Sequence, residues 1–106
     1  MQKYLNILFY IIVIIFITNY ILKMTNNILL VKISSPDKQI WEGEAKSVSS
    51  VNSKGAFDIL PLHANFISIV EDKPITVQTK SEKKEFKFKN AIIYASKNIV
   101  QIYTEI

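Results

Sequence analysis

KGAFDILPLHA, at residues 54–64, combines one of the chain's two glycines, one of its three prolines and its only histidine with a short apolar run. Gly55 follows polar residues that are typical of a turn, and Pro61 fixes the backbone where the apolar run ends. The pattern therefore predicts a strand that leaves a tight turn and then enters a rigid corner. A solvated linker would not carry the apolar residues at 57–60.

The residues on either side of this run also predict strands. Polar and apolar residues alternate at 75–80 and 85–89, whereas residues 91–95 are mostly apolar, which indicates deeper burial. Lys97 and Asn98 predict a two-residue turn, and Gly43 predicts a bulge or a bend. We expect eight or nine short strands, at residues 28–33, 39–41, 45–51, 57–60, 66–70, 75–80, 85–89, 91–95 and 99–103. This spacing predicts an all-β fold, an antiparallel β-sandwich or flattened barrel.

The N-terminal segment is apolar and predicts a helix. Residues 5–22 carry no charge, and as a helix they would reach about 27 Å, close to the thickness of a bilayer's hydrocarbon core. One interpretation is a single-pass transmembrane anchor. The other is that translation starts at Met24 and that residues 1–23 are upstream sequence. Both interpretations divide the chain into an apolar helix at 1–23 and a domain at 24–106.

Composition excludes several classes of function. The 13 basic residues are all lysines, and the 9 acidic residues are interleaved with them, which argues against a nucleic-acid surface. The absence of cysteine and the single histidine exclude a thiolate or histidine-rich zinc site. We expect no metal, no cofactor and no small-molecule substrate.

Asp58, His63 and Ser68 could suggest a catalytic triad, and we do not expect one. Ser68 lies in an alternating strand, whereas a nucleophilic serine needs a constrained turn and an oxyanion donor. His63 is either a partly buried residue bonded to the backbone, an exposed contact for a partner, or a titrating switch. Trp41 is either an anchor of the core or sandwich edge, or an interface hot spot.

The lysines near residues 80–89 alternate with two phenylalanines, an arrangement that an RNA-binding strand could share. Alternation along a strand would instead place Phe86 and Phe88 inward and the lysines in solvent. We favour the solvated face, since Glu82 and Glu85 dilute the positive charge.

Several of these motifs occur together in one family. Ser35-Pro36-Asp37 is followed by Trp41-Glu42-Gly43, and the most specific stretch is the run at 55–65. The domain resembles the N-terminal β-sandwich of the epsilon subunit of F-type ATP synthases, which is called delta in mitochondria. The resemblance covers nearly all of residues 28–105. It departs from the family pattern where Asp58 and Leu62 replace glycines, where Asn65 replaces a proline, and where Asn90-Ala91 replaces a Gly-Gly pair.

The resemblance implies a non-catalytic subunit of the central stalk. Such a domain would bind the gamma subunit, rest on the ring of membrane c subunits, and couple the rotation of that ring to the catalytic sector. The family's C-terminal helical hairpin has no counterpart in this sequence, so its inhibitory and ATP-binding roles are not carried over. The residues implied for the contacts with gamma and the c ring are Lys54, Gly55, Ala56, Phe57, His63, Ala64 and Trp41.

A membrane-anchored β-sandwich that binds another protein is the alternative function, and it depends on the segment at 5–22. Lys23, Lys32 and Lys38 follow that segment, which favours a domain on the cytoplasmic side of the cell membrane. In the family's role the domain would be peripheral, or single-pass if residues 1–23 are part of the protein. A rotating subunit would have to carry such a helix through lipid, which favours Met24 as the start.

Overall fold

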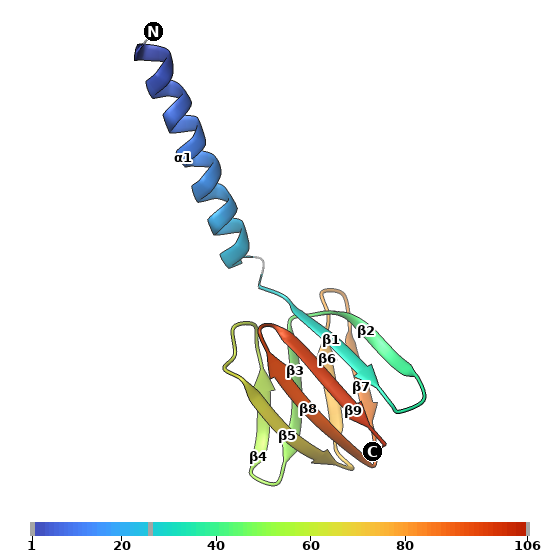
Figure 1. Cartoon of the computed structure of the whole chain (residues 1–106). Coiled ribbons are helices and arrows are strands. Elements are labelled where there is room, and N and C mark those ends of the chain that lie inside the picture. The colour runs from blue at the N-terminus through green and yellow to red at the C-terminus, as the bar shows by residue number, and fades with distance from the viewer. Residues whose placement is uncertain (1, 26, 106) are drawn as a thin grey trace.

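The computed structural model describes the backbone of residues 2–25 and 27–105, and the side-chain surroundings of residues 4–19 and 27–105. Within these residues one helix, α1 (Gln2–Thr25), precedes nine strands (Figure 1). The strands are β1 (Leu29–Ser34), β2 (Gln39–Ala45), β3 (Ser47–Asn52), β4 (Gly55–Ile59), β5 (Phe66–Glu71), β6 (Pro74–Gln78), β7 (Lys83–Lys87), β8 (Asn90–Ser96) and β9 (Ile99–Thr104).

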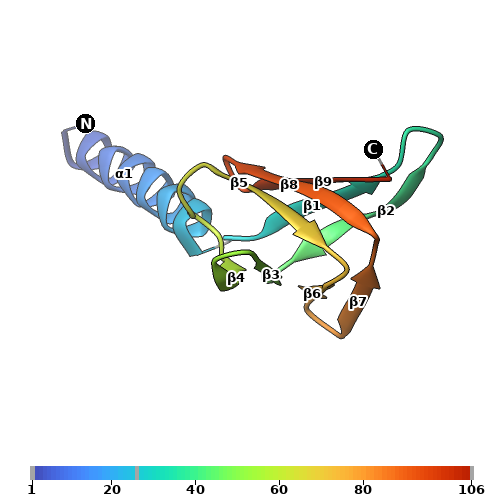
Figure 2. The same cartoon turned by 90° about the horizontal axis from the view of Figure 1, so that it is seen from below.

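The strands form two sheets that face each other, as the view along the sandwich shows (Figure 2). One sheet has five strands in the order β2-β1-β9-β8-β5, and the other has four in the order β4-β3-β6-β7. The predicted sandwich of about nine short strands is confirmed. The two-residue turn between β8 and β9 is confirmed as well, because Ser96 pairs with Ile99 while Lys97 and Asn98 have φ values of 52° and 62°.

One strand pair departs from the predicted antiparallel arrangement. β1 and β9 are parallel, with Val31 opposite Val100 and Ile33 opposite Ile102, whereas the other pairs among the described strands are antiparallel. The first and last strands of the domain therefore meet inside the larger sheet. A period of two identifies the buried side of each strand but not its neighbour, so the sequence pattern did not predict this pairing.

The space between the sheets is filled by aliphatic side chains. Inward-facing residues of β1, β8 and β9 alternate with outward-facing ones, so that Val31, Ile93 and Ile102 are fully buried. β3, β4 and β6 contribute Val48, Ile59, Ile75 and Val77 from the other sheet. The aromatic side chains that pack against this core are only partly buried.

Aromatic pairs instead close the two open edges of the sandwich. Trp41 of β2 lies 6.0 Å from Phe86 of β7 between ring centroids, and Phe57 of β4 lies 5.1 Å from Phe66 of β5. Phe86 also stacks on Phe88. The inward placement predicted for Phe86 and Phe88 is confirmed, because both pack against the aliphatic core.

The predicted bulge or bend at Gly43 is wrong. β2 continues through Gly43, which pairs with Val31, and the irregularity in this strand pair lies between Ile33 and Ser34. Gly43 is needed for space, because a Cβ at this position would lie 2.7 Å from Cζ2 of Trp41. The glycine gives the indole a flat surface on which to pack.

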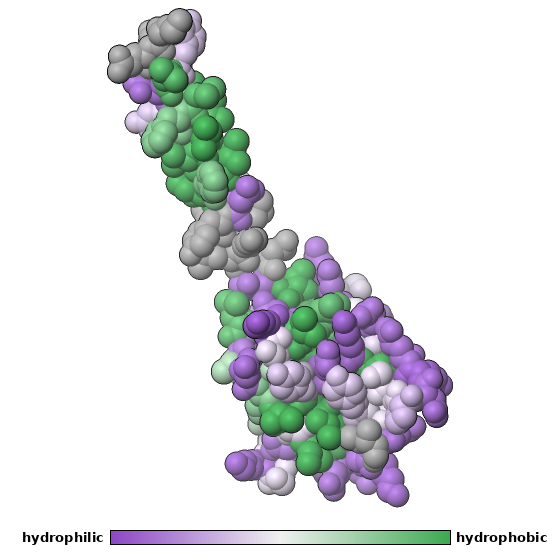
Figure 3. Space-filling model, viewed as in Figure 1, coloured by the Kyte–Doolittle hydropathy of each residue, from purple (hydrophilic) through white to green (hydrophobic). Residues whose placement is uncertain are grey.

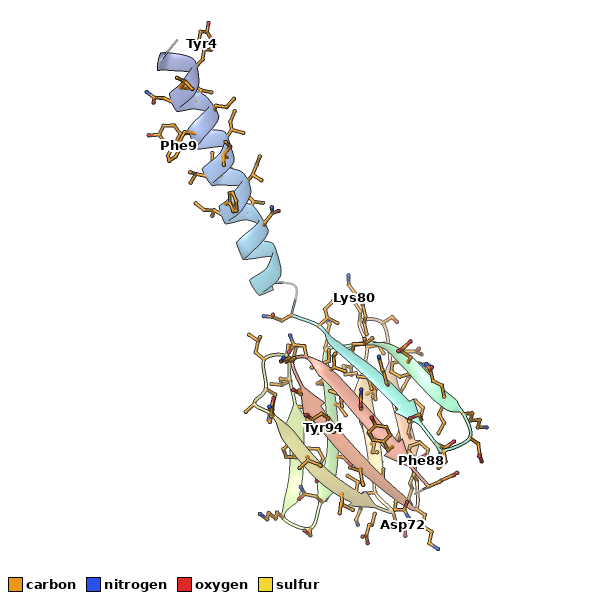
Figure 4. All side chains as sticks on the ribbon, in the orientation of Figure 1. Tyr4, Phe9, Asp72, Lys80, Phe88 and Tyr94 are labelled. Atoms are coloured by element: carbon orange, nitrogen blue, oxygen red, sulfur yellow. The ribbon has the colours of Figure 1, made fainter. Side chains whose placement is uncertain are left out.

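The structure does not support the predicted transmembrane anchor at 5–22. No helix in the described part of the chain is long and apolar enough to cross a membrane. In α1 the side chains of residues 4–19 are described. Tyr4 and Phe9 are among the exposed ones (Figure 4). The side chains of residues 20–23, on which part of the prediction depends, lie outside the described residues.

Two isoleucines on neighbouring strands test the assignment of the inner and outer faces. We expect Ile93→Ala to lower the free energy of unfolding by about 2–5 kcal/mol, because Ile93 is fully buried and its truncation leaves a cavity. Ile69→Ala is the matched control and should cost no more than about 1 kcal/mol, since Ile69 is 60% exposed. Chemical denaturation of both variants measures the difference, and equal losses would contradict the assignment.

The packing of Gly43 against Trp41 gives a second prediction. Gly43→Ala should displace the indole and lower the free energy of unfolding by about 1–3 kcal/mol, as overpacking does. Trp41 is the only tryptophan, so its fluorescence reports the displacement directly. Glu44→Ala, at the exposed neighbouring position, is the control. An unchanged emission spectrum in Gly43→Ala would show that the indole does not depend on the glycine.

Candidate functional site

The structure distributes the residues that the sequence singled out over a turn, a strand, a corner and the opposite edge of the sandwich. Lys54 lies in the turn between β3 and β4, which we call the hairpin tip (residues 52–55). His63 and Ala64 lie in the segment at 60–65, which we call the corner. Gly55, Ala56 and Phe57 belong to β4, which joins the tip to the corner, and Trp41 lies at the opposite edge of the sandwich. Residues 56–59 of β4 lie between tip and corner, and the distance along the strand from Gly55 to Leu60 is about 16 Å.

The hairpin tip is held by side chains that bond to the backbone and to the other sheet. Asn52 Oδ1 accepts a hydrogen bond from the Lys54 N–H at 2.8 Å, and Asn52 Nδ2 donates to Ser68 Oγ of β5 at 3.0 Å. Gly55 adopts a φ of 123°, which favours glycine, and a side chain there would meet open space. Lys54 is exposed, so its ammonium group is presented to solvent from a fixed turn.

The corner begins with a turn at residues 60–63. The His63 N–H donates to the Leu60 carbonyl oxygen at 3.1 Å, Pro61 occupies the second position, and Leu62 has a φ of 65° at the third. These are the features of a type II turn, whose third position normally holds glycine. A leucine in this conformation costs roughly 1–2 kcal/mol, because its Cβ approaches the backbone.

The turn between β8 and β9 holds the strained residue in place. The Leu62 N–H donates to Asn98 Oδ1 at 2.7 Å. Asn98 is itself fixed in the two-residue turn with Lys97. The corner is therefore attached to the end of the five-stranded sheet.

His63 connects the corner to the aromatic pair at the edge of the sandwich. The His63 ring meets Phe66 edge-on, with 5.7 Å between centroids, and Phe66 contacts Phe57. His63 Nδ1–H donates to the Ala64 carbonyl oxygen at 2.7 Å. The backbone bond agrees with the first of the three interpretations that the sequence left open, but His63 is exposed and not partly buried. A contact with a partner stays a prediction.

The outer side of the five-stranded sheet carries a group of large apolar side chains that reach solvent. We call this group the apolar face, and it consists of Ile67, Ile69, Ile92, Tyr94 and Tyr103. Tyr94 points outward from β8 (Figure 4), and Ile67 and Ile69 of β5 are 69% and 60% exposed. Pairing aligns Ile67 with Tyr94, Ile69 with Ile92, and Ile92 with Tyr103, so these side chains are neighbours.

The apolar face gives way to a charged surface over β1 and β2. Lys32 of β1 and Glu42 of β2 form an ion pair at 3.8 Å on the outer side of the same sheet. The space-filling view shows apolar residues grouped over β5, β8 and β9, and hydrophilic residues beside them over β2 (Figure 3). An exposed apolar group with a polar border is typical of a surface that binds another protein.

Sequence reasoning did not identify the apolar face, because the pattern of β5 is ambiguous. Period-two alternation along Phe66–Glu71 would allow either the two isoleucines or the Phe66, Ser68 and Val70 set to face inward. The structure buries Ser68, which is 8% exposed, and satisfies its hydroxyl with Asn52. The inward position of Phe66 in the edge pair is the signal that would have resolved the alternation.

A groove of about 490 Å³ connects the hairpin tip to the apolar face. Its lining includes Ser53 and Lys54 from the tip, and Ile67, Ile69 and Ile92 from the sheet. The groove joins one sequence-predicted residue, Lys54, to residues that only the structure identifies.

The candidate catalytic residues do not assemble. The Asp58 carboxylate accepts a hydrogen bond from Ser49 Oγ at 2.5 Å, Ser68 is bonded to Asn52, and the His63 ring bonds to its own corner. Among the described residues, no group of three or more His, Asp or Glu side chains is placed to hold a metal ion. The geometry supports binding of another macromolecule through apolar and charged surfaces.

Comparison with known proteins gives the family of this fold. Residues 28–106 match the model of the ATP synthase delta/epsilon chain β-sandwich domain. The ATP synthase epsilon chain of a Clostridium botulinum strain is 34% identical over 74 residues, which are 70% of this chain and 51% of the relative. That of a Nitratiruptor species is 33% identical over 57 residues, which are 54% of this chain and 44% of the relative. The chain spans about half the length of the curated relatives that it matches.

Solved structures share the fold at low sequence identity. A chain of the Euglena gracilis mitochondrial ATP synthase, in a structure of OSCP, F1 and the c ring, gives a TM-score of 0.68 at 12% identity. The match covers 74% of this chain and 51% of that chain. A chain of the Tetrahymena thermophila mitochondrial ATP synthase central stalk and c ring gives a TM-score of 0.62 at 13% identity, covering 74% of this chain and 63% of that chain.

The sequence motifs, the nine-stranded sandwich and the family match over 28–106 agree. The chain belongs to the ATP synthase delta/epsilon chain family through its β-sandwich domain.

Proposed function

We propose that this protein is a non-catalytic central-stalk subunit of an F-type ATP synthase, which couples rotation of the c ring to the catalytic sector through the gamma subunit. The observation that carries the proposal is the family match over residues 28–106. The structure supports it with a β-sandwich domain whose exposed surfaces suit protein binding. The alternative, a membrane-anchored binding module, is not favoured, because the family match accounts for the domain without an anchor.

The gamma subunit is the partner that we assign to the apolar face. Burial of a large aliphatic side chain contributes about 1.5–3 kcal/mol, so covering Ile67 and Ile69 would supply much of a stable contact. The ion pair of Lys32 and Glu42 borders the face and would remain at the rim, where charges add little to affinity.

The c ring is the partner that we assign to the hairpin tip. Lys54 and Gly55 form a protruding, exposed turn at the start of β4, which suits contact with polar loops of another subunit. Ala56 and Phe57 continue from that turn into the sheet, while His63 and Ala64 lie beyond the opposite end of β4, closer to the side assigned to gamma. Trp41 supports the domain from inside the other edge.

We assign the role of a central-stalk subunit to the β-sandwich domain, taken as residues 24–106. It would be peripheral to the membrane-bound complex, on the cytoplasmic side of the cell membrane. Co-expression of the full chain with the gamma and c subunits of the same organism tests the assignment. Retention of the chain in the purified complex is expected, and an intact complex that lacks the chain would contradict it.

The double variant Ile67→Lys/Ile69→Lys tests the apolar face. We expect its affinity for gamma to fall by about 100-fold or more, because two buried apolar contacts would be replaced by two charges that must be desolvated. Titration calorimetry with purified gamma measures the loss. The matched control is Glu42→Lys/Glu44→Lys, which adds positive charge to the polar half of the same sheet.

Thermal unfolding shows whether either double variant is destabilised. The thermal unfolding temperature of both should stay near that of the parent chain, since all four positions face outward. Equal affinity for gamma in the parent chain and in Ile67→Lys/Ile69→Lys would move the gamma contact away from the apolar face.

Lys54→Glu tests the hairpin tip. We expect the variant to be lost from the c ring several-fold more readily at low ionic strength, with a smaller difference at high salt, because exposed charges act through screened attraction. The measurement is the amount of chain retained on the complex after washes of increasing salt. Lys80→Glu, at the opposite end of the sandwich (Figure 4), is the control. A loss that does not depend on salt would contradict a charge contact.

A further inference from the structure

Two leucine side chains of the corner are exposed to solvent and do not pack into the core. Leu62 is 72% exposed and Leu60 is 53% exposed, and they flank Pro61 at the apex of the turn. Leu62 occupies a strained position, with a φ of 65°, and Leu60 lies two residues before it. Neither side chain belongs to the aliphatic core.

The strained backbone at Leu62 does not bring its side chain into the core, since Leu62 is mostly exposed. A glycine would adopt this backbone conformation freely, and an asparagine would adopt it at small cost. Backbone strain of this kind persists where the surrounding structure enforces it, and it is concentrated at functional sites. Here the Asn98 side chain enforces it through its bond to the Leu62 N–H.

The neighbours of the two leucines define the chemistry of a partner. Ile99, 38% exposed, follows Asn98 at the start of β9 and adds a third apolar side chain to this end of the sandwich. Lys97 is exposed in the same turn, and the ion pairs recorded among the described residues do not include it. An apolar projection beside an exposed ammonium group is complementary to an apolar cleft with a carboxylate at its rim.

The corner is continuous with the apolar face. The His63 ring contacts Phe66, and Phe66 and Ile67 both line the groove at the apolar face. The corner directly precedes Phe66 and Ile67 of β5, so it lies next to the end of the apolar face. This continuity points to the partner already assigned to the apolar face, and not to a separate one.

We infer that Leu60 and Leu62 form a peg that inserts into an apolar cleft of the gamma subunit, with Lys97 facing a carboxylate at the rim of that cleft. The inference rests on the proposed function and adds a specific anchor to it. Its distinctive consequence is that the residue which strains the free chain strengthens the complex.

Leu62→Gly separates these two effects. In the full chain we expect the thermal unfolding temperature to stay the same or rise, because glycine adopts positive φ without strain. The dissociation constant with purified gamma should rise by about 10–100-fold, since the side chain that would be buried is gone. Leu62→Met is the matched control, because it keeps an apolar side chain at the strained position, and its affinity should stay within about threefold of the parent chain.

A second measurement does not depend on any variant. With leucine methyl groups labelled by ¹³C, the Leu60 and Leu62 signals should shift when gamma is added, because they move from solvent to an apolar cleft. Unchanged signals would overturn the peg. Lys97→Glu should weaken binding several-fold at low salt, and unaltered binding would remove the carboxylate from the inferred cleft.

The outcomes distinguish this inference from the function on which it rests. If gamma binds Leu62→Gly as tightly as the parent chain, the peg is overturned and the proposed function stands. If the parent chain does not bind gamma, both fail. If the parent chain forms a dimer that Leu62→Gly dissolves, the peg fits a second copy and gamma is the wrong occupant. A large fall in the unfolding temperature of Leu62→Gly would assign the leucine a structural role and also overturn the inference.

Discussion

The closure of the two open edges is the constraint on which this sandwich depends. The core is aliphatic, and water would reach it if the edges were not covered by the aromatic pairs of Trp41 with Phe86 and of Phe57 with Phe66. The second pair also determines the outer surface. Because Phe66 faces inward, the period of two along β5 turns Ile67 and Ile69 to solvent, so closing one edge creates the apolar face.

Residue patterns predicted much of the fold and failed at identifiable points. Nine strands, the Lys97-Asn98 turn and the inward Phe86 and Phe88 followed from alternation and from turn chemistry. The parallel pairing of β1 with β9 did not, because alternation says nothing about the choice of a neighbour. The bend predicted at Gly43 is absent, because the glycine instead provides space for Trp41. This contact depends on a side chain two residues away on the same strand face.

The candidate site was less accessible to sequence reasoning. Residues 54–64 are continuous in the chain, but Lys54 and His63 lie beyond opposite ends of β4. The apolar face gathers residues from β5, β8 and β9, which are distant in sequence, and Ser68 occupied the position that a simple pattern would give to an apolar residue. The hydrogen bond from Asn52 is what permits a buried serine there, and a pattern of single residues does not reveal such a partner.

The bracing of β3 and β4 bears on how such a domain could transmit force. A subunit that touches one partner at the hairpin tip and another at the corner transmits torque only if the distance between the two contacts stays fixed. Side-chain hydrogen bonds outside the strand ladder oppose its deformation: Ser49 to Asp58 across the hairpin, Ser50 to the Pro74 carbonyl, and Asn52 to Ser68 in the other sheet. The last of these matters most, because it ties the tip to the strand that carries the apolar face. A displacement of the tip is therefore passed to β5 through the polar contact and the packed edge together, without requiring any strand to bend.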